Sequence, residues 1–124
     1  MPRLHILFTV VLLTLVFFPQ DFVKAAEIKA FILHSYHQEY PWTKLENRGI
    51  VETLQGLNPQ SDINFSTEYL DSKRVHVSIE YQEFFVDYLE TKYTDLKPDI
   101  IFVTDDNAAE FMTNHRRRLF PTVP

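Results

Sequence analysis

The feature that most constrains this chain is the alternation of three strand-like runs with segments of helical periodicity. Residues 29–33 and 99–104 are short, nearly continuous apolar runs, which is typical of strands buried on both faces. Residues 63–69 alternate apolar and polar side chains and predict a third strand. Such alternation implies right-handed βαβ crossovers, so we predict an α/β fold, a parallel sheet with helices on both faces.

Three helices are predicted between and after these strands. The first begins at a capping-box pattern, Thr43 to Glu46, and ends near Asn58-Pro59. The second covers about residues 78–93, and the third follows the last strand, capped by Asp105 or Asp106, and ends at about His115. Two apolar stripes at helical spacing predict core packing: Leu45, Ile50, Leu54 and Leu57 in the first helix, and Tyr81, Phe84, Phe85, Tyr88 and Leu89 in the second.

The predicted strand order is 2-1-3, with the first strand in the middle. In doubly wound sheets a crevice opens at the carboxyl ends of the strands where crossovers leave on opposite faces, here strands one and three. This order places His34-Ser35-Tyr36 beside Asp105-Asp106. A three-stranded parallel sheet with an open apolar edge is marginal, so we expect residues 26–124 to be a partial, truncated lobe of a larger domain.

The N-terminal residues have the order of a secretory signal peptide. Arg3 and His5 precede an apolar stretch from Ile6 to Phe18, and the segment ends in small residues before Ala26. The stretch is shorter than the roughly 18 apolar residues of a membrane span. We expect cleavage after Ala25 and a periplasmic or extracytoplasmic location, with an uncleaved membrane anchor as the alternative.

Composition excludes several classes of protein. A formal net charge of -5 argues against nucleic acid as a partner, because phosphate binding needs clustered cations. The one basic run, 116–118, is expected to complement the carbonyls at the end of the third helix. With no cysteine and only two glycines, the chain has no thiolate nucleophile and no glycine-rich phosphate loop, and we expect no cofactor.

Five sequence blocks resemble one known family, the ABC-transporter substrate-binding-like proteins. They occur in the family's order over nearly all of the chain after residue 25: FILHSYH at 31–37, YPWT at 40–43, RGI at 48–50, EYLDSKR at 68–74, and PD at 98–99 leading to VTDDNAA at 103–109. The resemblance implies a periplasmic-binding fold of type I, in which two α/β lobes close on a small ligand. The family also supplies extracytoplasmic sensor domains to histidine kinases and diguanylate cyclases, so a permease or a downstream signalling module is an implied partner.

The candidate ligand-binding residues lie in the loops that end the first and third strands. Aromatic side chains above a crevice provide contact area with a polar handle, and carboxylates can receive a cationic group of the ligand. The alternatives are that Trp42 packs under the first helix and that one of Asp105 and Asp106 only caps a helix while the other points to solvent. Asp71 and Lys73 are expected to form a loop salt bridge or a turn. The candidate site comprises His34, Ser35, Tyr36, Trp42, Asp105 and Asp106.

Two other classes of function compete with solute binding by a non-enzymatic protein. A metal-dependent hydrolase could use His34, His37 and Asp105 or Asp106 as ligands, although a His-x-x-His pair on a loop lacks the fixed geometry of one on a helix. A receiver-like regulatory domain shares the alternating pattern, but it should carry its acidic pair after the first strand, where this chain has His34-Ser35.

Overall fold

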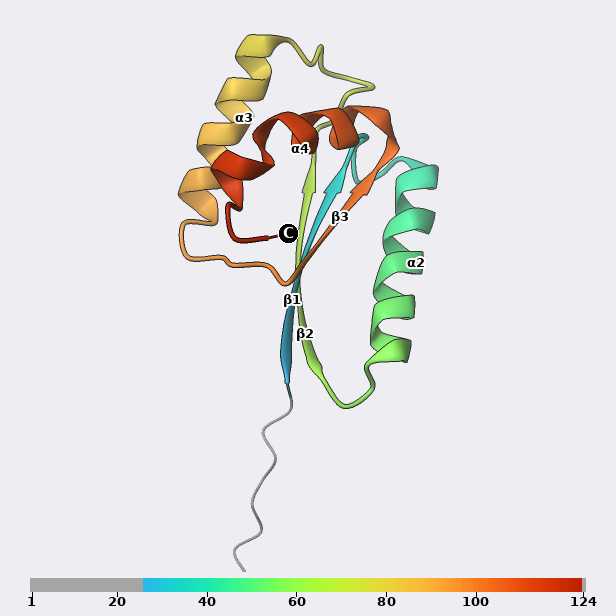
Figure 1. The fold of residues 1–124 in the computed structure, drawn as a ribbon. Coiled ribbons are helices and arrows are strands. Elements are labelled where there is room, and N and C mark those ends of the chain that lie inside the picture. The colour runs from blue at the N-terminus through green and yellow to red at the C-terminus, as the bar shows by residue number, and fades with distance from the viewer. Residues whose placement is uncertain (1–25, 124) are drawn as a thin grey trace, which may run out of the picture.

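The computed structural model describes residues 26–123, and in them three strands alternate with three helices (Figure 1). The order of elements is β1 (Glu27–His34), α2 (Pro41–Leu57), β2 (Asp62–Tyr69), α3 (Ile79–Lys92), β3 (Ile100–Thr104) and α4 (Asp105–Leu119). All three strands and the ends of the first two helices fall within a few residues of their predicted positions. The third helix is longer than predicted, since it continues to Leu119 rather than ending near His115.

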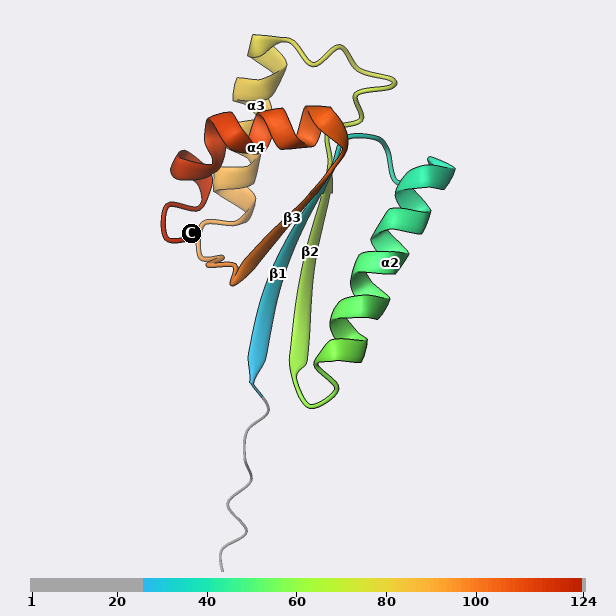
Figure 2. The same cartoon turned by 45° about the vertical axis from the view of Figure 1, so that its right-hand side comes forward.

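The sheet is parallel and its strand order is β2-β1-β3, which confirms the predicted fold class and the central place of the first strand. His34 pairs with Tyr69 on one side and with Thr104 on the other, so the three carboxyl ends are level. Helix α2 lies on one face of the sheet, and α3 and α4 lie on the other (Figures 1 and 2).

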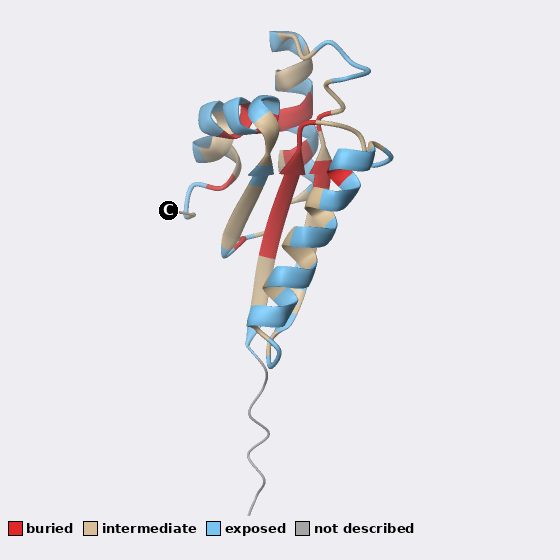
Figure 3. Cartoon of the chain, turned by 90° about the vertical axis from the view of Figure 1, so that its right-hand side faces the viewer, coloured by how far each residue is buried: buried red, intermediate tan, exposed pale blue. Residues whose placement is uncertain are grey.

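The main core lies between the sheet and the pair α3 and α4. Residues 30–34 of β1 and the next residue, Ser35, are all buried. Figure 3 shows this central strand as the most buried element. Side chains alternate along a strand, so Phe31 and Leu33 face the core cluster while Ile32 and His34 face the α2 side. The cluster contains Phe31, Leu33, Leu70, Phe85, Val86, Leu89, Ala108, Phe111, Met112 and Phe120.

The α2 side of the sheet is less complete. Leu45 and Leu57 of the predicted apolar stripe are 55% and 75% exposed, while Ile50 and Leu54 are half-buried. A groove of about 610 Å³ runs between α2 and β3, with Ile50, Leu54 and Phe102 among its lining residues. The stripe prediction therefore holds for the middle of α2 and is wrong for its two outer leucines.

Helix α2 does not begin with the predicted capping box. It starts at Pro41, its N-cap residue is Tyr40, and no side chain makes a capping hydrogen bond. Proline favours the first helical position because its fixed φ suits the helix and it lacks an N–H that would need a partner. Thr43 is therefore inside the first turn, where its hydroxyl cannot act as a cap.

Ser78 caps helix α3, since its Oγ accepts the Tyr81 N–H at 3.2 Å. Serine is one of the residues that favour this position. Its aromatic stripe packs into the core through Phe85 and Leu89. Phe84 and Tyr88 are 67% and 38% exposed, so the core interpretation is wrong for these two residues.

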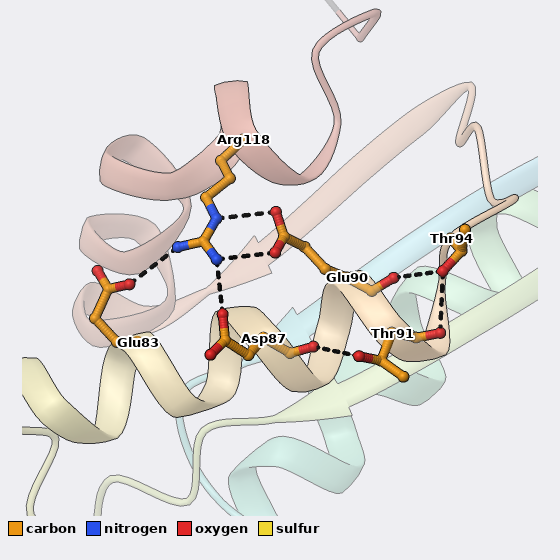
Figure 4. Close-up of polar contacts among 6 residues, drawn as sticks. All are labelled: Glu83, Asp87, Glu90, Thr91, Thr94 and Arg118. Carbon is orange, nitrogen blue, oxygen red and sulfur yellow. Dashed lines mark hydrogen bonds and ion pairs between the residues drawn. The ribbon is translucent and has the colours of Figure 1, made fainter.

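Arg118 of α4 makes ion pairs with three carboxylates of α3 (Figure 4). Arg118 donates to Glu83 at 2.9 Å, to Asp87 at 2.7 Å and to both carboxylate oxygens of Glu90 at 2.9 Å. The three carboxylates raise the pKa of the guanidinium above its ordinary value, with the Glu90 hydrogen bonds as the largest cause. The basic run does lie in the last turn of α4, but Arg118 contacts a neighbouring helix rather than the helix end.

Candidate functional site

His34 is fixed at the carboxyl end of β1 by hydrogen bonds at both ring nitrogens. The Asn47 amide oxygen can only accept, so Nε2 donates to it, and in the neutral ring Nδ1 accepts from the Thr104 hydroxyl. Its Nδ1 lies 2.9 Å from Thr104 Oγ1 and its Nε2 lies 3.1 Å from Asn47 Oδ1, and the ring stacks on Tyr69 with centroids 5.3 Å apart. The side chain is fully buried. Burial lowers the pKa of His34, against smaller opposing effects of the Asn47 hydrogen bond and the charges of Glu46 and Asp105. The ring is therefore neutral at neutral pH.

Ser35 connects the first strand to the start of α4. Its hydroxyl donates to the Thr104 carbonyl at 2.7 Å and accepts the Ala108 N–H at 2.8 Å. Ser35 therefore supplies the cap that the sequence assigned to Asp105 or Asp106. The prediction that Asp105 or Asp106 is the N-cap is wrong, because the N-cap residue of α4 is Thr104, which makes no side-chain cap hydrogen bond. Both aspartates lie in the first turn, where their charges face the positive end of the helix dipole as predicted.

Asp105 has an unusual backbone and an unusual side chain. Its φ is 62°, in the left-handed region that only glycine, asparagine and aspartate adopt readily. Its Oδ2 is buried and has no hydrogen-bond partner among the described residues. Asp106 beside it is exposed. The strained turn thus holds a carboxylate oxygen, without a partner, where β3 meets α4.

The loop after β2 completes this edge of the sheet, and sequence analysis did not assign it to the site. Ser72 donates from its backbone N–H and from its hydroxyl to the Ser35 carbonyl, each at 2.8 Å, and Asn107 donates to Ser72 Oγ at 3.1 Å. The rule that carboxyl ends of parallel strands meet at one edge applies to β2 as well and would have indicated this loop.

Aromatic residues of the loop after β1 form a small cluster with a lysine. Tyr36 and Tyr40 pack edge to face with centroids 5.2 Å apart, and Lys73 Nζ lies 4.3 Å from the Tyr36 ring centre and 5.0 Å from that of Tyr40. These are cation–π distances. Asp71 forms a turn, since its carbonyl accepts the Arg74 and Val75 N–H groups at 2.9 and 3.0 Å, and its carboxylate pairs with Arg74 at 2.7 Å rather than with Lys73.

The six predicted site residues are thus brought together only in part. His34, Ser35 and Asp105 meet around Thr104, and Tyr36 follows directly in the chain. His34 and Ser35 are buried and engaged in structural hydrogen bonds. Trp42 is 55% exposed in the first turn of α2, so the alternative in which it packs under that helix is wrong.

Within residues 26–123 no group of three or more histidine, aspartate or glutamate side chains is arranged to hold a metal ion. In the same range no helix is long and apolar enough to cross a membrane. The predicted signal peptide lies outside the described residues.

Comparison with known proteins returned no match to a family model, a curated protein or a solved structure.

Proposed function

We propose that this chain is part of an extracytoplasmic domain that binds a small polar or amino-acid-like solute without chemically changing it. The observation that carries the proposal is the Asp105 carboxylate, whose buried Oδ2 has no partner among the described residues at the carboxyl edge of the sheet. A buried acceptor without a partner is costly, and a ligand that donates a hydrogen bond or carries a cationic group would satisfy it.

The position of this carboxylate supports the same proposal. Helix α2 leaves β1 toward one face and α4 leaves β3 toward the other, so the edge beside Ser35 and Asp105 is a topological switch point. Open α/β sheets bind ligands at such points. The edge is also held rigidly by the bonds of Ser35 and Ser72, and a rigid site loses less entropy on binding.

The cluster of Tyr36, Tyr40 and Lys73 supplies the second kind of group that a solute site needs. Tyrosine offers apolar area with a polar tip, and Lys73 offers a charge for a carboxylate. A zwitterion such as an amino acid carries both charges that these groups would bind: an ammonium group for the Asp105 carboxylate and a carboxylate for Lys73. In this proposal a second lobe closes over the edge, and the bound state is passed to a permease or to a signalling module, as in the family that the sequence resembles.

The test is a thermal-shift survey of the purified chain with the twenty amino acids and simple amines and carboxylates. We expect at least one zwitterionic solute to raise the melting temperature in a saturable way. A survey in which no solute raises it would contradict the proposal.

A further inference from the structure

We propose that a small cavity between the first turn of α2 and the end of β2 is an oxyanion site, which takes a carboxylate, sulfate or phosphate group. The cavity has a volume of about 160 Å³. None of its lining residues belongs to the six candidate site residues at the crevice. They are Gln38, Thr43, Lys44, Asn47, Arg48 and Tyr69.

Thr43 is the observation that points to a ligand. The residue is 1% exposed, and its Oγ1 is buried with no hydrogen-bond partner among residues 26–123. A hydroxyl inside a helix usually bonds a carbonyl of the preceding turn, and a buried one without any partner is destabilising. Because Thr43 lines the cavity, an acceptor held there would supply the missing bond.

The other lining groups are also hydrogen-bond donors, and none is acidic. Lys44 and Arg48 carry positive charges. Asn47 gives its Oδ1 to His34, which leaves its amide N–H groups for the cavity. Burial and the charges of Glu68 and Glu39 raise the pKa of Tyr69, so its hydroxyl remains protonated and can donate. A cavity rich in donors selects a ligand rich in acceptors.

The start of α2 favours the same sign of charge. The helix has 17 residues, its N-cap makes no side-chain bond, and its first turn contains no acidic residue. No carboxylate within the first turn therefore compensates the positive end of the helix dipole. Glu39, just before the helix, lies outside the lining, and its carboxylate accepts a hydrogen bond from Lys44 Nζ at 2.5 Å. An incoming oxyanion and Glu39 compete for Lys44.

The experiment titrates the chain with acetate, sulfate and inorganic phosphate at constant pH and ionic strength. The signals are the fluorescence of Trp42, the only tryptophan, and the melting temperature. We expect saturable binding of at least one anion, and the three arms distinguish a planar carboxylate from a tetrahedral oxyanion. Arg48→Gln should weaken binding about tenfold, the loss of one charge-assisted hydrogen bond. Glu39→Gln should strengthen it, because Lys44 is released.

Thr43→Val separates ligand binding from folding. Valine has nearly the same shape and removes the hydroxyl, so without anion the variant should melt at the wild-type temperature or above it, while the anion-dependent rise in melting temperature should be lost. Arg117→Gln is the control, since it removes an equal charge from an exposed position of α4. Absence of saturable binding by all three anions overturns the proposal. Equal weakening by Arg48→Gln and Arg117→Gln, or full binding by Thr43→Val, also overturns it.

Discussion

Ser35 caps helix α4 from the loop directly after β1: its Oγ accepts the Ala108 N–H at 2.8 Å although 73 residues separate them in the chain. The same hydroxyl donates to the Thr104 carbonyl at 2.7 Å. One buried side chain thus satisfies a free N–H at the start of α4 and ties β1 to the end of β3. The carboxyl edge of the sheet depends on this contact for its shape.

Removing this cap should destabilise the fold. We expect Ser35→Ala to lower the free energy of unfolding by about 1–2 kcal/mol, the usual cost of losing an N-cap hydroxyl. Asp106→Ala is the control, because Asp106 is exposed and makes no cap, and it should change stability by less than about 0.5 kcal/mol. Urea denaturation measures both. A larger loss from Asp106→Ala would return the capping role to the aspartate.

His34 should make the fold sensitive to acid. Burial lowers its pKa in the folded protein, while the unfolded chain takes up a proton at the ordinary value near 6.5. The unfolded state therefore binds more protons as the pH falls below about 6.5, and the free energy of unfolding falls with it until the pH reaches the folded pKa. Above about pH 6.5 this contribution is constant.

Urea denaturation of His34→Gln at several pH values checks this prediction. Its stability should depend less on pH than that of the wild type below about pH 6.5, by at most about 1.4 kcal/mol for each pH unit. His76→Gln, at an exposed position of the loop after β2, should keep the wild-type slope. Identical pH slopes for wild type and His34→Gln would mean that the buried ring does not resist protonation.

The edge formed by β3 should make the described domain self-associate. No charged residue interrupts Ile100 to Thr104, and Val103 is 38% exposed. The opposite edge, β2, carries polar residues such as Asn64 and Ser66. Exposed apolar edges without charges pair with other strands. Sedimentation velocity should show association that rises with concentration and is reduced by Val103→Lys but not by Asn64→Lys. A wild type that is monomeric at every concentration would contradict this.

Export can be tested separately from binding. The order of residues 1–25 predicts removal of this segment and delivery outside the cytoplasm. Mass spectrometry of the protein from fractionated native cells should find a chain that begins at Ala26. A cytoplasmic product that retains Met1 would argue against the export proposal and would favour the receiver-like alternative.

The strands and their order could be predicted from sequence because burial on both faces leaves a continuous apolar run, and because crossover handedness limits the topology. The start of α2 was predicted wrongly because Thr43 and Glu46 match the capping-box spacing, while Pro41 sets the true start. The capping-box spacing by itself does not show that a proline two residues earlier already begins the helix.

The remaining errors concern contacts between residues far apart in the chain. Neither the cap provided by Ser35 nor the bonds of Arg118 to α3 leave a local pattern. The left-handed backbone of Asp105 has only a weak sequence signal, since aspartate also suits a helix N-cap. The Thr43 hydroxyl, which has no partner within the described part of the chain, has no sequence signal because its environment depends on packing between α2 and its neighbours.

The central claim is that the carboxylate at the start of α4 receives the cationic group of a solute. The direct test is calorimetric titration of wild type, Asp105→Asn and Asp106→Asn with the zwitterion that gives the largest thermal shift. Asparagine tolerates the left-handed φ of residue 105, so Asp105→Asn should melt near the wild-type temperature. We predict that its affinity falls at least tenfold, because a buried charge pair is lost, while Asp106→Asn binds nearly as the wild type does. Unchanged affinity in Asp105→Asn would contradict the account and would confine this aspartate to a structural role.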